Sequence, residues 1–143
     1  MVGVYLAESA GLPMRSVASA VAAVGQGLLE DRYQTGRGEW CYHQRLFDDV
    51  TLIGVEALDA ARKEHGLQLA AGTARRNVEV RGVDLAALVG CRFRAGEVVL
   101  RGKRPCEPCR YLDRVTGQAA RAALAGRGGL RATVPQRRPP QRR

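Results

Sequence analysis

The most reactive side chains in this sequence are two cysteines separated by two residues, in the segment Cys106-Glu107-Pro108-Cys109. Thiolate is the reactive form of cysteine, and the basic residues Lys103, Arg104 and Arg110 beside the segment favour it. Three kinds of chemistry fit the pair: disulfide exchange, half of a zinc site, or one functional thiol with a companion. The alternative is a pair of small inert side chains, because free cysteines are often simply buried.

Two of these chemistries need further residues. A zinc site would need two more ligands, which Cys41 and His43 could supply, although a separation of one residue departs from the usual spacing of structural zinc ligands. A thioredoxin-like site would need a βαβ unit around the cysteines, and the helix expected after Cys109 is short. Cys41 and Cys91 are otherwise expected to be structural.

Arginine-rich segments form a second set of candidates. Arg32 could bind phosphate while Asp31 holds its guanidinium, or the two could be a solvated ion pair in the long surface loop expected from Gly25 to Arg45. The segment Arg75-Arg76-Asn77 offers two guanidinium groups and an amide, a set suited to an anionic ligand. The alternative for that segment is a row of charges guarding an edge strand.

The elements that must position these residues are mostly short strands. Alternating and β-branched runs predict strands over 2–7, 16–24, 50–53, 77–81, 91–94, 97–101 and 130–134. Helical spacing predicts helices over 55–65 and 118–124, and Asp84 is a candidate N-cap for a short helix before Val89. The fold class is therefore mostly β with inserted helices (α+β), and the many non-local pairings favour a barrel-like sheet.

Length and composition limit the architecture and the compartment. A chain of 143 residues is one domain, expected over residues 1–134, and the Arg/Pro-rich residues 135–143 are expected to be a disordered tail. The net charge of +9 comes almost wholly from arginine, so an anionic partner is plausible. The apolar run Val2 to Ala7 is too short for export or membrane spanning, so we expect a cytoplasmic protein with no membrane contact.

The order of these segments resembles the MOSC family, the domain named for the molybdenum cofactor sulfurase C-terminus. The motifs that carry the resemblance are Glu30-Asp31-Arg32-Tyr33, Val50 to Ile53, Asn77 to Gly82, Gly90 to Gly96, Arg104-Pro105-Cys106 and Gly126 to Val134. The chain departs from the family pattern in having Glu30 where glycine is usual. It also lacks the closing I-x-x-G-D strand.

This resemblance implies a MOSC-type β-barrel, here without its closing strand, that binds molybdenum cofactor (molybdopterin). Cys106 would be the catalytic residue and would carry sulfur or ligate molybdenum, with Cys109 as a companion and a second candidate metal ligand. The cofactor would be held by Asp31, Arg32, Arg75, Arg76, Asn77, Arg104 and Cys106. The implied activity is sulfur transfer or reduction of N-hydroxylated compounds, with a sulfur-donor or electron-donor protein as partner. Pyridoxal phosphate binding is a further association of the family.

Two functions of other classes remain open on the residues alone. One is a basic, non-catalytic module for nucleic acid, although contacts with nucleic acid are expected mainly as non-specific contacts of the tail. The other is a thiol-redox or zinc protein that uses Cys106 and Cys109.

Overall fold

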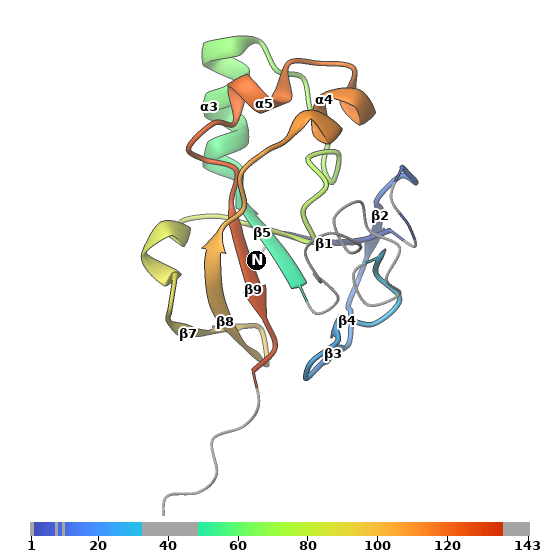
Figure 1. Cartoon of the computed structure of the whole chain (residues 1–143), viewed down its shortest axis with the longest axis vertical. Coiled ribbons are helices and arrows are strands. Elements are labelled where there is room, and N and C mark those ends of the chain that lie inside the picture. Colours follow the sequence, from blue (N-terminus) through green and yellow to red (C-terminus); the bar gives the residue numbers. More distant parts are fainter. Residues whose placement is uncertain (1, 8, 10, 33–48, 136–143) are drawn as a thin grey trace, which may run out of the picture.

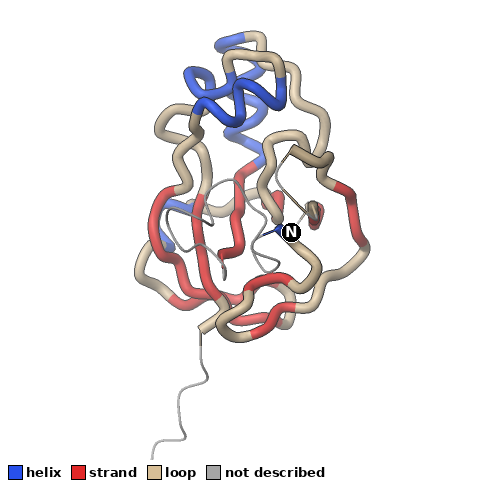
Figure 2. Tube along the Cα trace, turned by 45° about the vertical axis from the view of Figure 1, so that its right-hand side comes forward, coloured by secondary structure: helices blue, strands red, loops and turns tan. Residues whose placement is uncertain are grey.

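The computed structural model of the chain describes residues 2–7, 9, 11–32 and 49–135. Its strands are β1 (Gly3–Leu6), β2 (Arg15–Val17), β3 (Ala22–Ala23), β4 (Gly27–Leu28), β5 (Asp49–Gly54), β6 (Val78–Val80), β7 (Arg92–Ala95), β8 (Val98–Pro105) and β9 (Leu130–Thr133). The helices are α3 (Val55–His65), the 3-10 helix η1 (Leu85–Leu88), α4 (Arg110–Thr116) and α5 (Ala120–Ala123). Figure 1 and Figure 2 show α3, α4 and α5 gathered at one end of the strands.

The strands confirm a mostly β fold with a few helices. Seven of them form one sheet in the order β2-β1-β6-β5-β9-β8-β7, and β3 pairs separately with β4. Within the described residues the outer strands β2 and β7 do not pair, so the sheet is open and is not closed into a barrel. The absence of a closing strand in this part of the chain agrees with the incomplete barrel expected from the sequence.

The centre of the sheet is a parallel pair that the sequence patterns do not reveal. β5 and β6 run parallel, with Leu52 opposite Val78, and α3 connects them as a crossover helix. The other strand pairs of this sheet are antiparallel. β6 therefore lies inside the sheet, and the prediction that Arg75-Arg76-Asn77 could guard an edge strand is wrong.

Buried apolar side chains lie on both faces of the central strands. On β5, Leu52 belongs to a cluster formed by strand residues, whereas the next residue, Ile53, packs with residues of α3, α4 and α5. A strand buried on both faces has a continuous apolar run instead of an alternating one, which explains the pattern Val50 to Ile53.

Several local predictions hold and three change. Helix α3 ends at Gly66 as expected: Gly66 has φ +67°, and its N–H and that of Leu67 donate to the carbonyls of Arg62 and Ala61. The strand expected over 16–24 is instead split into β2 and β3. The short helix after Asp84 is a 3-10 turn, and Asp84 makes no side-chain cap hydrogen bond. The single helix expected after Cys109, over 118–124, is present as the shorter α5, and α4 is an additional helix before it.

In the described part of the chain, no helix combines the length and the hydropathy needed to cross a membrane. The proposed tail lies outside the described residues except for Pro135, so its disorder stays a prediction.

Candidate functional site

Cys106 directly follows β8, and a buried arginine binds its peptide group. The Cys106 N–H donates to the Gly129 carbonyl at 2.8 Å. Arg76 donates from Nη2 to the Cys106 carbonyl at 3.2 Å and from Nε to the Gly128 carbonyl at 2.9 Å. Cys106 is 1% exposed and Arg76 is 8% exposed. One guanidinium therefore ties the cysteine loop to the glycine loop before β9, away from bulk solvent.

The two glycines of that loop allow this close approach. A Cβ built on Gly128 would lie 2.3 Å from the Cys106 carbonyl oxygen. A Cβ built on Gly129 would lie 1.9 Å from the Leu52 carbonyl oxygen, and Gly129 has φ +106°. Any side chain at either position would push the loops apart, so the Gly-rich segment is needed to place Cys106.

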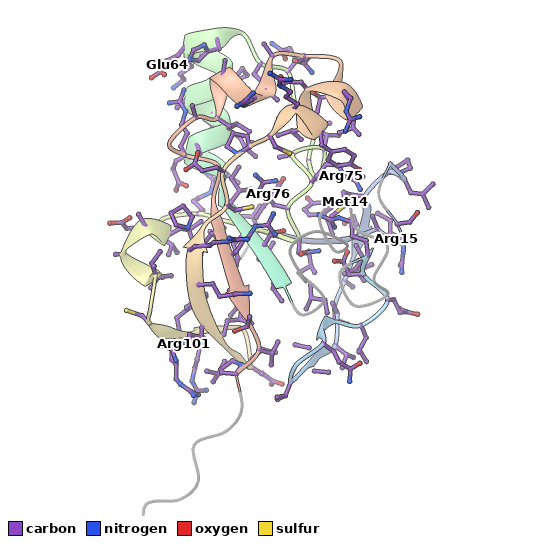
Figure 3. The ribbon with its side chains drawn as sticks, in the orientation of Figure 1. Met14, Arg15, Glu64, Arg75, Arg76 and Arg101 are labelled. Atoms are coloured by element: carbon purple, nitrogen blue, oxygen red, sulfur yellow. The ribbon has the colours of Figure 1, made fainter. Side chains whose placement is uncertain are left out.

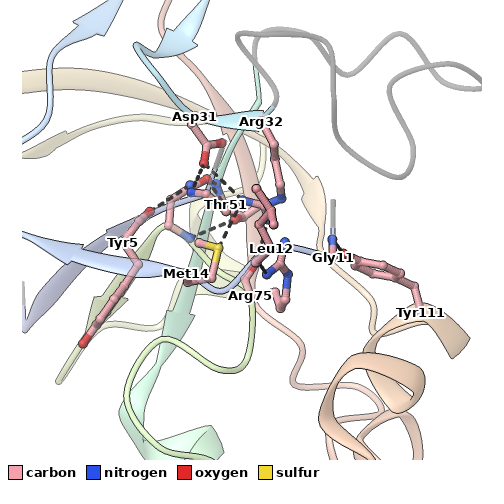
Figure 4. A network of polar contacts seen from close by, with 11 residues as sticks. Tyr5, Gly11, Leu12, Met14, Asp31, Arg32, Thr51, Arg75 and Tyr111 are labelled. Carbon is pink, nitrogen blue, oxygen red and sulfur yellow. Dashed lines mark hydrogen bonds and ion pairs between the residues drawn. The ribbon is translucent and has the colours of Figure 1, made fainter. Parts of the chain in front are cut away.

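Arg75 and Arg76 point to different neighbours although they are adjacent in sequence. Arg75 has φ +62°, a left-handed conformation that is uncommon for a residue with a side chain. Its guanidinium donates to the Leu12 carbonyl and lies 5.8 Å from the centroid of the Tyr111 ring on α4. Figure 4 shows this contact beside Gly11, whose N–H donates to the Tyr111 hydroxyl.

Asp31 and Arg32 are buried, which corrects the prediction that they lie in a surface loop. They are 1% and 4% exposed, and Arg32 Nη1 lies 3.2 Å from Asp31 Oδ1. Asp31 also accepts the Ala7 N–H at 3.1 Å. Arg32 Nη2 donates to the Arg75 carbonyl at 2.9 Å, so the two segments that the sequence singled out do meet (Figure 4).

Asn77 occupies the middle of the sheet. Its Oδ1 accepts from the N–H of Thr51 at 3.0 Å and from the Thr51 hydroxyl at 3.1 Å, and its Nδ2 donates to the Tyr5 carbonyl at 3.1 Å. Asn77 is 0% exposed. These contacts join β1, β5 and β6, so Asn77 holds the strands that carry the arginines.

The remaining predicted site residues are less buried than this group. Cys109 is half-buried and stands at the N-cap position of α4, while Arg104 is exposed on β8 opposite Arg131. Cys91 is exposed, contrary to the expectation of a packed side chain. Within the described ranges, no group of three or more His, Cys, Asp and Glu side chains is placed to hold a metal ion. Cys41 and His43, the further zinc ligands considered above, lie outside those ranges.

A cavity of about 380 Å³ opens beside Arg75. Its walls include Met14, which accepts from Arg32 Nη1 through its sulfur at 3.5 Å, and residues of α4. The structure thus forms two groups near the start of α4, which begins directly after Cys109. Asp31, Arg32 and Arg75 are linked to one another, and Arg75 also contacts Tyr111 on α4. Arg76 instead binds the carbonyl of Cys106.

Glu79 is a buried carboxylate on β6 that the sequence patterns did not indicate. Glu79 is 4% exposed and accepts the Gly72 N–H at 3.0 Å. Burial raises the pKa of the Tyr5 hydroxyl, and the negative charge of Glu79 raises it further. The signal in the sequence was weak, because a charged residue between two valines reads as the solvent face of a strand.

Comparisons with known proteins agree with this architecture. The family model described as MOSC domain matches residues 42–138, which is more than half of the chain. The crystal structure of the YUAD protein from Bacillus subtilis superposes with a TM-score of 0.71 at 17% identity, covering 92% of this chain and 85% of that one. A crystal structure described as a hypothetical protein gives a TM-score of 0.67 at 20% identity, covering 92% of this chain and 59% of that one. A search of curated proteins found no match.

Proposed function

Because this chain belongs to the MOSC domain family, we propose that it binds molybdenum cofactor through Cys106. The observation that supports the proposal best is the position of Cys106 at the end of β8. Its N–H donates to the Gly129 carbonyl, and its own carbonyl accepts from Arg76. A thiol held in this way is a sulfur ligand of fixed position rather than a mobile surface group.

The donor set fits the chemistry of that cofactor. Thiolate is a soft ligand that suits molybdenum and sulfur chemistry, and guanidinium groups suit a phosphate. Cys106 would supply the thiolate, and Arg75, at the wall of the cavity beside α4, would contact the phosphate with Arg32 behind it. When bound, the cofactor would supply a metal centre for two-electron redox or sulfur-transfer chemistry.

The other predicted residues would position this group rather than contact it. Arg76 uses Nε, Nη1 and Nη2 on the carbonyls of Gly128, Ala74 and Cys106, and the Asn77 side chain, directly before β6, is hydrogen-bonded to β1 and β5. We therefore assign Arg76 to orienting the Cys106 loop and Asn77 to holding the sheet. Cys106 is 1% exposed, so loading requires a movement that uncovers its thiol.

We do not extend the proposal to pyridoxal phosphate. That cofactor reacts with a lysine amine, and the two lysines of the chain, Lys63 and Lys103, are both exposed on regular elements of the structure.

The decisive experiment compares Cys106→Ser with Cys109→Ser after production in a host that makes the cofactor. Elemental analysis for molybdenum and zinc, together with cyanide-releasable sulfur, should show molybdenum or labile sulfur in the wild type. Cys106→Ser should lose both, because a hydroxyl is not a soft ligand and cannot carry a sulfane sulfur, and Cys109→Ser should keep most of the load.

Equal loading of the wild type and Cys106→Ser would contradict the proposal, and zinc lost in both variants would favour a zinc protein. Labile sulfur without molybdenum would assign sulfur transfer, and molybdenum with turnover of an N-hydroxylated amidine would assign reduction.

A further inference from the structure

One face of the β7–β8–β9 region carries basic side chains at most of its outward positions. We name it the basic face, and its residues are Arg92, Arg94, Arg101, Lys103, Arg104 and Arg131. All except the half-buried Arg131 are exposed, and the alternating residues Phe93, Leu100, Gly102 and Ala132 point toward the interior. This alternation places the charges on a single surface.

The strand register brings these charges into direct opposition. Arg92 lies opposite Arg101, and Arg104 lies opposite Arg131. The register shifts between Gly102 and Arg104, and this irregularity returns Arg104 to the same face as Arg101. The strand register therefore concentrates positive charge on one surface of the sheet, which an anionic partner would complement.

We propose that the basic face docks a protein whose surface presents carboxylates. Arginine forms two parallel hydrogen bonds with a carboxylate, and five of the six cations are arginines. Val99, which is 39% exposed, lies on the same face opposite Arg94 and supplies an apolar contact among the charges. Arginine together with apolar side chains is typical of protein interfaces.

The same face suits nucleic acid less well. Proteins that bind single strands without sequence preference stack bases on aromatic side chains, and Phe93, the aromatic residue of β7, packs against the core. A two-stranded ribbon can enter the major groove of duplex DNA, but here β9 pairs along the other edge of β8 and makes the surface three strands wide.

The position of the basic face gives the docked protein a role. β8 carries Arg101 and leads directly to Cys106, about 17 Å farther along at the spacing of an extended strand. Figure 3 shows Arg101 low on the β7–β8 side and Arg76, which binds the Cys106 loop, near the other end of β8. The docked protein would then be the donor of sulfur or electrons to Cys106. This role rests on the proposed function, whereas the docking itself rests on charge and register.

The test uses the full chain and two fluorescent polymers, a random copolymer of L-glutamate and L-tyrosine and polyuridylate, in titrations followed by anisotropy at low salt. The double variant Arg94→Gln/Arg101→Gln should weaken copolymer binding about tenfold, because each exposed ion pair contributes roughly 0.7 kcal/mol. The matched control Arg62→Gln/Arg121→Gln removes the same charge from exposed positions on α3 and α5 and should change binding less than twofold. Val99→Ser should weaken binding of the copolymer and leave binding of polyuridylate unchanged.

Two results would overturn the inference. If both double variants lose binding equally, the effect is one of net charge and the basic face has no special role. If polyuridylate binds more tightly than the copolymer at equal charge and Val99→Ser has no effect on either polymer, the face binds RNA instead. Molybdenum content is measured on the same samples: Arg94→Gln/Arg101→Gln should keep it, and Cys106→Ser should keep copolymer binding. A failure of cofactor loading and a failure of docking are thus seen separately.

Discussion

Replacing Arg76 by Met tests whether one buried guanidinium holds the cysteine loop in place. Methionine has a similar length and no donor, so the change removes the local bond to the Ala74 carbonyl and the bonds to the Cys106 and Gly128 carbonyls, which lie 30 and 52 residues away in sequence. A hydrogen bond to a charged group contributes about 1.5–3 kcal/mol, so the two long-range bonds alone amount to roughly 3–6 kcal/mol. Relief from burying a cation offsets part of this loss. We expect a net loss of about 3 kcal/mol, which a domain of ordinary stability survives.

Two measurements check the size and the place of the effect. Urea unfolding at pH 7 gives the loss in free energy of unfolding. The rate at which a disulfide reagent labels Cys106 gives the local effect, measured in a Cys41→Ser/Cys91→Ser/Cys109→Ser background so that only Cys106 reacts. In that background the thiol is 1% exposed and should react slowly, and Arg76→Met should accelerate it.

A control separates local release from general destabilisation. Leu28→Ala removes a core side chain on β4 and should cost about 2–5 kcal/mol. At equal loss of stability, Cys106 should react faster in Arg76→Met than in Leu28→Ala, because only the former frees the loop. Arg76→Lys keeps the charge and should lose roughly half as much stability as Arg76→Met. A loss below about 0.5 kcal/mol with an unchanged labelling rate would refute the assignment of Arg76 to loop positioning.

Two further predictions follow from single residues. Glu30 has φ +70°, a conformation that costs a residue with a Cβ about 1–2 kcal/mol. Glu30→Gly should therefore raise the melting temperature, and Glu30→Ala should not. Equal effects of the two substitutions would show that loss of the carboxylate, and not the backbone conformation, changes the stability. Glu64 accepts from Arg127 at 2.8 Å, and this hydrogen bond with the Arg127 charge lowers the pKa of Glu64. A lowered carboxylate pKa stabilises the fold at neutral pH, and that contribution is lost as the pH falls through the folded-state pKa. Glu64→Gln should therefore lower the melting temperature at pH 7 and have no effect well below pH 4, as thermal melts over a pH series would show.

The backbone of Glu30 supports the match between the segment Glu30-Asp31-Arg32-Tyr33 and the family motif. Glycine is usual at this position in the family pattern, and the structure gives it the left-handed backbone that glycine adopts without strain. The residue type departs from the pattern while the conformation follows it. The departure is therefore tolerated by the fold at an energetic cost, and it does not argue against the family.

Local patterns in the sequence were enough to predict several of the elements. The helix that ends at Gly66, the β7–β8 hairpin and the last strand depend on contacts between near neighbours: a left-handed glycine, a tight turn and alternating side chains. The cysteine pair and the arginine segments could also be singled out, because their chemistry belongs to the residue types themselves.

Only the tertiary structure decided which of those residues meet. Arg75 and Arg76 look equivalent in the sequence, yet Arg75 turns toward Leu12 and α4 while Arg76 turns toward Cys106. The burial of Asp31 and the parallel pairing of β5 with β6 also depend on partners far away in the chain. Sequence patterns report the period of a side chain along its own element, whereas hydrogen bonds between distant segments depend on how the elements pack. The amino-acid sequence thus identified the family and singled out Cys106 as a candidate, and the packing of the sheet against the helices determined which arginine binds the Cys106 loop.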